Sequence, residues 1–251
     1  MKKTVYLTLR FKSMLVCALA FLLGFASVLL IFSDSTSASA ETSSTVYENS
    51  VPITIIIDAG HGGEDGGTQS SDGTLEKDIN LQISLKLEKL LRLMGYNTVM
   101  VRSEDKLIYS GNPDTIRARK VSDLNNRLKI AESNLDAIFI SIHQNYFTQS
   151  KYSGAQVFYS PNNENSKLLA ESIQCSVVEL LQPENGRKIK KSGSDIFLLN
   201  RMKIPSVMVE CGFMSNPSEA LLLKDTEYQK KTALSIANGI NEYLLLIREE
   251  K

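Results

Sequence analysis

The sequence predicts an α/β fold: a single domain with a twisted, mostly parallel six-stranded sheet flanked by helices. From about Val51 onward, apolar runs of strand length alternate with amphipathic patterns of helix length. Several of the short runs are apolar throughout, as is typical of strands covered on both faces. Hydrophobic residues make up 43% of the chain and charged residues 22%, which is ordinary for a domain with a sizeable core.

Six segments fit the strand pattern, and four fit the helix pattern. The clearest helix starts near Glu76, where Ile79, Ile83 and Leu87 recur at a spacing of four, and Gly95 ends it. The predicted strands are 53–58, 97–102, 137–142, 155–159, 196–199 and 206–210, and the other predicted helices are 123–132, 166–181 and 226–247. The segment 102–121 has no firm assignment, and we expect it to frame one side of the functional site.

The N-terminal 40 residues have the pattern of an export segment. A basic start precedes an uncharged apolar run over 14–32, and Ala38-Ser39-Ala40 supplies small residues that a signal peptidase accepts. The run is also long enough to span a bilayer, so residues 1–40 are a signal peptide or an N-terminal membrane anchor. In both cases the rest of the chain is expected outside the cytoplasm, because the positive charges stay inside. Residues 41–50 are predicted to be a linker, and 51–251 the folded domain.

Charge and cysteine content indicate which partners to expect and whether a disulfide forms. The chain has 28 basic and 28 acidic residues, so it offers no net field toward nucleic acid, and we expect no nucleic-acid partner. Contact with a membrane is expected only through an uncleaved N-terminal segment. Cys175 and Cys211 allow a disulfide in an exported protein. Their places in a helical pattern and after an apolar strand favour two buried thiols instead.

Both histidines of the chain follow apolar runs. His61 comes after ITIIIDAG and His143 after AIFISI, while Glu210 closes the run SVMV. In open α/β sheets the functional crevice lies beyond the carboxyl ends of the strands, so these side chains should converge. Glu76 follows the flexible turn SSDGT and can fold back beside His61.

Two imidazoles and a carboxylate form a set that binds Zn²⁺ in hydrolytic sites and leaves one position open for water. A second carboxylate must then take the proton of that water. We assign Zn²⁺ as the cofactor, with His61, Glu76 and His143 as its ligands and Glu210 as the general base.

Each of these residues also has a simpler interpretation. Glu76 alone could only complement the dipole of its helix, and Glu210 alone could form a strand-end salt bridge. The glycines of GHGGEDGG do not match a dinucleotide fingerprint, since Asp65 stands where a glycine is required. We expect them to let the backbone approach a metal and its substrate. Ser141 lies near His143, but the sequence contains no nucleophile elbow.

Five stretches carry a resemblance to a known family. They resemble, in the expected order, the motifs of zinc-dependent N-acetylmuramoyl-L-alanine amidases. The stretches are DAGHGGEDGG, TLEKDINL, SIHQN, SGAQVFY and VECGFMSNP. The match covers about residues 53–245. The resemblance implies the same roles for His61, Glu76, His143 and Glu210 as those assigned above. Gln144 departs from the family pattern, and we expect its side chain to point away from the metal.

SDLNNRLKIAE and IFLLNRMKIPSVMVE are most similar to the germination-specific branch of this family, from endospore-forming bacteria. That similarity implies a peptidoglycan substrate, cleaved at the amide between N-acetylmuramic acid and L-alanine. Stem peptides would leave the spore cortex, so that muramic-δ-lactam can form and germination can proceed. The expected location is the forespore intermembrane space or the cell wall. Because the sequence has no wall-binding repeat, timing, location or an accessory protein would restrict the enzyme.

Three alternatives stay open at this point. A zinc peptidase cutting another bond of the stem peptide would use the same residues. A vegetative autolysin would cut the same bond in a different wall. A noncatalytic wall-binding module would require the site to be vestigial.

Overall fold

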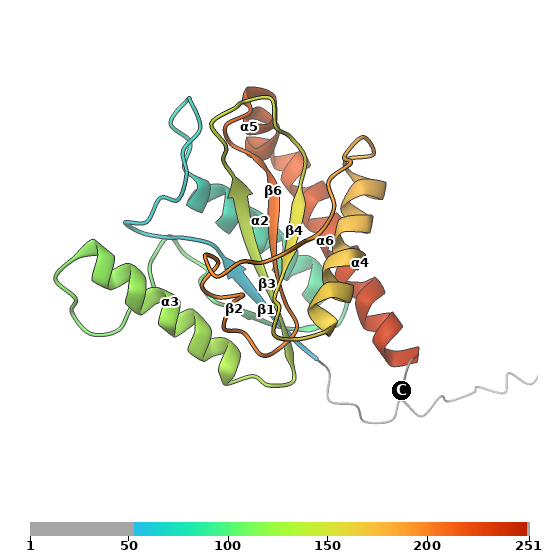
Figure 1. Ribbon diagram of the computed structural model, residues 1–251, viewed down its shortest axis with the longest axis horizontal. Helices are drawn as coiled ribbons and strands as arrows, with labels where there is room; N and C mark the ends of the chain where they lie inside the picture. Colours follow the sequence, from blue (N-terminus) through green and yellow to red (C-terminus); the bar gives the residue numbers. More distant parts are fainter. Residues whose placement is uncertain (1–52, 250–251) are drawn as a thin grey trace, which may run out of the picture. The chain divides into compact units, whose positions relative to one another are not determined.

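The computed structural model describes residues 53–249, and these form one α/β domain (Figure 1). The predicted signal peptide or anchor and the predicted linker lie outside the described residues. Six strands make a single sheet in the order β2-β1-β3-β6-β4-β5. The strands are β1 (Thr54–Ala59), β2 (Asn97–Met100), β3 (Ala137–Asn145), β4 (Gln156–Tyr159), β5 (Lys190–Lys191) and β6 (Ser206–Phe213).

The sheet is mostly parallel, as predicted. β1 pairs in parallel with both β2 and β3, β3 pairs in parallel with β6, and β4 with β5. The pair of β4 and β6 is antiparallel. Strands covered on both faces bury every side chain, and Ile55, Ile56 and Ile57 are accordingly all inaccessible to solvent.

Five helices flank the sheet, and they divide between its two faces. They are α2 (Glu76–Leu93), α3 (Ile116–Glu132), α4 (Asn165–Leu180), α5 (Pro217–Lys224) and α6 (Thr226–Glu249). The larger core packs α2, α4 and α6 against the face that carries Ile55 and Ile57. The smaller core packs α3 against the face of Ile56 and Phe139, so α3 stands apart in Figure 1.

One predicted strand is wrong. Residues 196–199 form turns, in which the amide of Asn200 donates to the carbonyl of Ile196 and that of Met202 to the carbonyl of Leu198. Leu198 and Met202 are buried in the smaller core, so the apolar run reflects burial and not strand pairing. The sixth strand is Lys190–Lys191, whose two exposed lysines give no apolar pattern.

Two helices differ from the prediction, one in its extent and one in having no predicted counterpart. α3 starts at Ile116, before the predicted residue 123, where the side chain of Thr115 accepts a hydrogen bond from the amide of Ala118. Ile116 is 51% exposed, so the first turns of α3 have no buried stripe for periodicity to detect. The short helix α5 was not predicted, and Asn216 caps its start by accepting from two backbone amides.

The two cysteines within residues 53–249 are both free, but only one of them is buried. Cys211 lies inside β6 and is almost inaccessible, and burial raises the pKa of its thiol. Cys175 is exposed, against the expectation of two buried thiols. Among residues 53–249, no helix is both long and apolar enough to cross a membrane.

Candidate functional site

His61 lies in the loop that leaves β1, and its backbone is held in an unusual conformation. Its φ of 61° falls in the left-handed region, which non-glycine residues rarely occupy. Oδ2 of Asp65 lies 2.9 Å from Nδ1 of the imidazole, which leaves Nε2 facing into the site. The carboxylate of Asp65 is itself paired with Lys120, at 2.6 Å. A carboxylate on the far nitrogen fixes the orientation of a metal-binding histidine in many metal sites.

Two buried arginines hold the carbonyls of this loop. Nη2 of Arg127 donates to the carbonyl of His61 at 2.7 Å, and Nη1 donates to Ala59 at 2.9 Å. Arg102 donates to the carbonyls of Ala59 and Gly60, at 2.8 and 2.9 Å. These bonds stabilise the positive φ of His61, because a buried guanidinium needs the carbonyl oxygens as acceptors.

Arg127 is neutralised by two buried carboxylates. It lies 2.5 Å from Asp58 in β1 and 2.6 Å from Asp123, one turn before it in α3. Burial by itself raises the pKa of Asp58, but Arg127 and the hydroxyl of Ser141 hold it below its usual value. The ion pair therefore ties α3 to the strand that presents His61.

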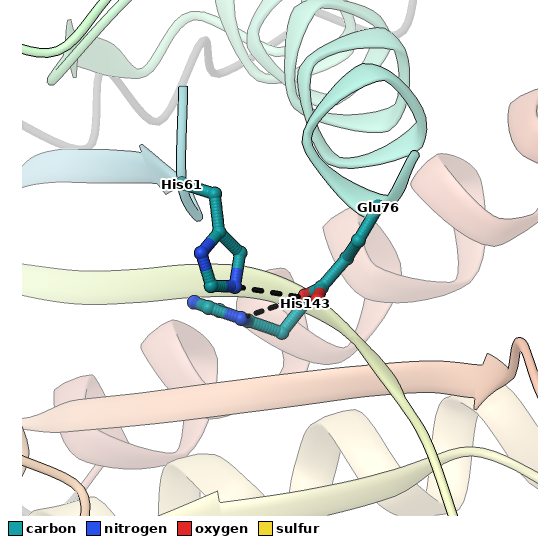
Figure 2. Close-up of side chains that lie close together, drawn as sticks. All are labelled: His61, Glu76 and His143. Atoms are coloured by element: carbon teal, nitrogen blue, oxygen red, sulfur yellow. Dashed lines mark hydrogen bonds and ion pairs between the residues drawn. The ribbon is translucent and has the colours of Figure 1, made fainter. Parts of the chain in front are cut away.

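Glu76 is the first residue of α2, which packs on the face of the sheet opposite to α3. Its Oε1 lies 2.9 Å from Nδ1 of His143, and its Oε2 lies 3.3 Å from Nε2 of His61. Figure 2 shows the carboxylate pointing from the helix end toward both rings, with a dashed line from each ring meeting it. The ligand atoms of the three side chains all lie within 4.8 Å of one another, so they can hold one metal ion.

Backbone and side-chain donors fix the carboxylate of Glu76. The amides of Thr68 and Gln144 donate to its two oxygens at 2.9 and 3.1 Å, and Nδ2 of Asn80 donates to Oε1 at 3.2 Å. Gln144 in turn donates through its side chain to Asn80. Gln144 is buried and projects to the face opposite His143, as expected, where it supports Glu76 from behind.

His143 and Glu210 lie inside their strands and not after them. β3 continues through His143 to Asn145, β6 continues through Glu210 to Phe213, and the two residues are direct partners in the parallel pair. Oε2 of Glu210 is buried and accepts no hydrogen bond from the described residues. Within residues 53–249 no ion pair involves Glu210, so the strand-end salt bridge is not formed there.

Two glycines of GHGGEDGG are required by the close packing of these groups. A Cβ at Gly60 would collide with the imidazole of His143. A Cβ at Gly67 would lie 2.5 Å from Oε2 of Glu76 and 2.7 Å from the ring of His61, and Gly67 also has a positive φ of 69°. Gly60 and Gly67 therefore allow the backbone to approach the side chains of His61, Glu76 and His143 closely.

Residues 55–242 match the sequence profile of a family described as N-acetylmuramoyl-L-alanine amidase. The chain belongs to this amidase family. It is 34% identical over 228 residues to a germination-specific N-acetylmuramoyl-L-alanine amidase of Bacillus subtilis, covering 90% of this chain and 93% of the relative. The enzyme class is therefore N-acetylmuramoyl-L-alanine amidase, and its substrate is peptidoglycan.

Solved structures of amidases share this fold. The CwlD amidase from Clostridioides difficile, solved in complex with the GerS lipoprotein, is 43% identical, with a TM-score of 0.74. The match covers 77% of this chain and 99% of that one. The catalytic domain of CwlV from Bacillus (Paenibacillus) polymyxa is 31% identical, with a TM-score of 0.62 over 76% of this chain and 98% of that one.

The environment of Glu210 in the amidase favours the protonated acid. Burial raises the pKa of Glu210 to about 7, and Glu76 adds to the rise, although both histidines oppose it. A carboxyl group with a pKa near neutrality can both accept and return a proton. For His61, burial works against the charged form, but Asp65 and Glu76 raise its pKa to about 9.

Serine catalysis is not supported by the position of Ser141. Its side chain is fully buried, and its hydroxyl donates to Oδ2 of Asp58 at 2.7 Å. No hydrogen bond within residues 53–249 joins Ser141 to a histidine. The hydroxyl therefore belongs to the ion pair of Asp58 and Arg127.

Several supporting residues were not identified from the sequence. The segment 102–121 does frame the site, since Arg102 binds the His61 loop and Asp105 accepts from the amide of Gly63 at 2.7 Å. Arg127 lies in the stretch SDLNNRLKIAE, where helical periodicity treats a charged residue as solvent-facing. The available signal for Asp65 was its spacing of four residues from His61.

Proposed function

We propose that the amidase is zinc-dependent, with His61, Glu76 and His143 as the metal ligands and Glu210 as the general base. The observation that carries this proposal is the convergence of two imidazoles and one carboxylate beside a second carboxylate that has no protein partner among the described residues. Nitrogen and carboxylate donors in a set of three suit Zn²⁺ in hydrolytic sites.

The donor set fits this metal in spacing as well as in chemistry. Zinc bonds of about 2 Å require neighbouring ligand atoms to lie roughly 3 to 4 Å apart. The contacts of Glu76 with His143 and His61, at 2.9 and 3.3 Å, agree with that requirement. Zinc bound by such a set supplies Lewis-acid polarisation of a carbonyl and lowers the pKa of water.

The residues of the chain account for the proton transfers. Oε2 of Glu210 is free to accept the proton of the attacking water and to return it to the amide nitrogen as the bond to L-alanine breaks. A pKa of about 7 keeps both transfers close to balance near neutral pH. His143 in the neighbouring strand fixes the distance between the base and the ligand set.

The connection after β3 leaves the strand that carries His143. The connection between β3 and β4, residues 146–155, contains turns and bends but no helix. No helix of this connection therefore lies over the site.

We further propose that this amidase removes stem peptides from spore cortex peptidoglycan, which prepares muramic acid for δ-lactam formation and allows germination. The support is the similarity to a relative named as a germination-specific amidase and to a CwlD amidase. A role as a vegetative autolysin predicts activity on both kinds of wall without preference.

The proposal extends to the location and the partner of the amidase. We propose that residues 1–40 export the enzyme, as a cleaved signal peptide or as an anchor, and that 51–251 act in the forespore intermembrane space or the cell wall. The CwlD amidase was solved in complex with a lipoprotein. We propose an accessory protein of this kind as a partner of this amidase.

Product analysis tests the proposed reaction. Purified cortex peptidoglycan is digested with the zinc-loaded enzyme, and the fragments are analysed by mass spectrometry. We expect peptides with a free L-alanine amino group together with intact N-acetylmuramic acid. New amino groups at any other stem residue would instead identify a peptidase, and a metal-loaded protein without products would identify a noncatalytic module. Parallel digestion of vegetative wall separates the cortex enzyme from the autolysin.

A further inference from the structure

A row of polar side chains continues across the sheet beyond the proposed base. Gln156 of β4 is the direct partner of Glu210 in the antiparallel pair of β4 and β6. Directly opposed residues on neighbouring strands project to the same face. His143, Glu210 and Gln156 therefore lie in one line over three adjacent strands.

Arg187 extends this row onto the segment before β5. Its Nη2 donates to Oε1 of Gln156 at 2.5 Å. Nε2 of Gln156 donates to the carbonyl of Lys188 at 2.8 Å, and the side chain of Asn185 accepts from the amide of Arg187 at 3.0 Å. Gln156 thus holds both the guanidinium of Arg187 and the backbone next to Arg187.

An open groove of about 360 Å³ lies beside this row. Its lining includes two cations and several aromatic rings: Arg187, Lys190, Phe147, Tyr152, Phe158 and Phe213. The guanidinium of Arg187 lies 4.9 Å from the ring centre of Phe213, and the ammonium of Lys190 lies 5.6 Å from that of Phe158. The rings hold the cations in place without neutralising them.

The two cations of the groove form no salt bridge within residues 53–249, and the carboxylates of Glu210 and Glu219 interact with Arg187 only beyond salt-bridge distance. No ion pair there involves Arg187 or Lys190, and the groove lining contains no acidic residue. Nε of Arg187 is buried and makes no hydrogen bond to the described residues. A guanidinium has five donors in a planar fork that fits a carboxylate, so the groove has unused capacity for an anion.

The chemistry of the substrate indicates which anion this is. In a muramoyl-alanine amide the lactyl carboxyl group is consumed by the bond to be cut, and the remaining sugar groups are hydroxyls and acetamides. The glycan side of that bond is therefore neutral, and the ionised carboxyl groups of the substrate lie on the stem peptide. A cationic groove next to the base complements the peptide side and not the sugar side.

We propose that Arg187 and Lys190 bind a carboxylate of the stem peptide, and that this groove determines specificity for acidic over amidated stems. The proposal rests on the amidase activity, and it assigns Gln156 as a positioning residue for Arg187. Substrates that differ only in charge isolate the effect.

The test compares two soluble muropeptides with the same sequence. One has free peptide carboxyl groups, and in the other every peptide carboxyl group is converted to a carboxamide. Cleavage of both is followed by chromatography, and kcat/KM is measured for each. We expect the wild-type enzyme to prefer the free acid by roughly 10- to 100-fold, mainly through KM, as for loss of a charge-assisted hydrogen bond.

Variants assign that preference to the groove. Arg187→Gln should bring the ratio of the two kcat/KM values close to one, because an effect of the substitution on the cleavage step itself would change both values alike. Arg187→Lys keeps the charge but not the planar fork, and should retain part of the preference. Lys167→Gln removes an exposed lysine of α4 and should leave the ratio at its wild-type value.

Two outcomes would overturn the proposal. These are equal kcat/KM values for both substrates in the wild-type enzyme, and full retention of the preference in a folded Arg187→Gln variant with wild-type metal content. If the wild-type enzyme cleaved neither substrate, the amidase activity itself would be in question, which is a different failure.

Discussion

His143 and Glu210 face each other directly across the parallel pair of β3 and β6. Adjacent strands lie about 4.8 Å apart, so the pairing places a predicted metal ligand and the proposed base side by side without any loop between them. Side chains on sheet strands are held more rigidly than side chains on loops. The separation between ligand and base is thus a property of the sheet register.

Glu210→Gln should separate chemistry from metal binding. The amide has nearly the same shape but cannot take a proton, so we expect kcat to fall by about 10²- to 10⁴-fold with metal content unchanged. Glu179→Gln, an exposed change in α4, serves as the matched control. Wild-type turnover by the Glu210→Gln enzyme would eliminate Glu210 as the base.

Removing one imidazole should weaken metal binding directly. His61→Ala and His143→Ala each leave one histidine and Glu76, and we expect zinc affinity to drop by more than about 100-fold, beyond the usual effect of a supporting residue. Zinc per chain is measured by elemental analysis after dialysis. Two variants that both keep a full equivalent of zinc would refute the ligand set.

Asp65→Asn tests the support of His61. The amide still offers an oxygen to Nδ1 but loses the charge and the ion pair with Lys120. We expect zinc affinity to fall by roughly 10- to 100-fold while the fold is retained. Competition with a chromophoric chelator measures the affinity. Asp114→Asn, at an exposed position, is the control and should bind zinc as the wild type does. Wild-type zinc affinity in Asp65→Asn would show that Asp65 does not support His61.

Arg127→Met should destabilise the domain. It leaves Asp58 buried without its cation and removes two donors from the His61 loop, at a cost of about 3–5 kcal/mol in the free energy of unfolding. Urea unfolding of the metal-free protein measures the loss, with the exposed Arg117→Met as control.

A second substitution shows whether Asp58 is the cause of that loss. Combining Arg127→Met with Asp58→Asn removes the unpaired charge. The double variant should therefore lose less free energy of unfolding than the two single variants lose together. Strict additivity would mean that the two side chains do not interact energetically.

The local pattern of residues was enough to predict the fold class, and it singled out four side chains that the fold brings together. Strand and helix periods are encoded in short stretches of sequence. Continuous apolar runs such as Ile55–Ile57 therefore predicted β1, β3 and β6, and the spacing of Ile79 and Ile83 predicted α2. The chain has two histidines, so His61 and His143 were the one imidazole pair that the sequence offered to a metal.

Only the tertiary structure decided how those residues are supported. The turns at 196–199 and the two-residue strand Lys190–Lys191 depend on distant contacts that leave no period in the sequence. Arg127 and Arg102 look like surface charges until the fold brings buried carbonyls and Asp58 within hydrogen-bonding distance. Likewise, the row from His143 through Glu210 and Gln156 to Arg187 joins four chain segments through sheet register and one side-chain hydrogen bond. Sequence alone determined which chemical groups the protein has, whereas strand pairing decided which of them meet, because register and burial are set by contacts between residues far apart in the chain.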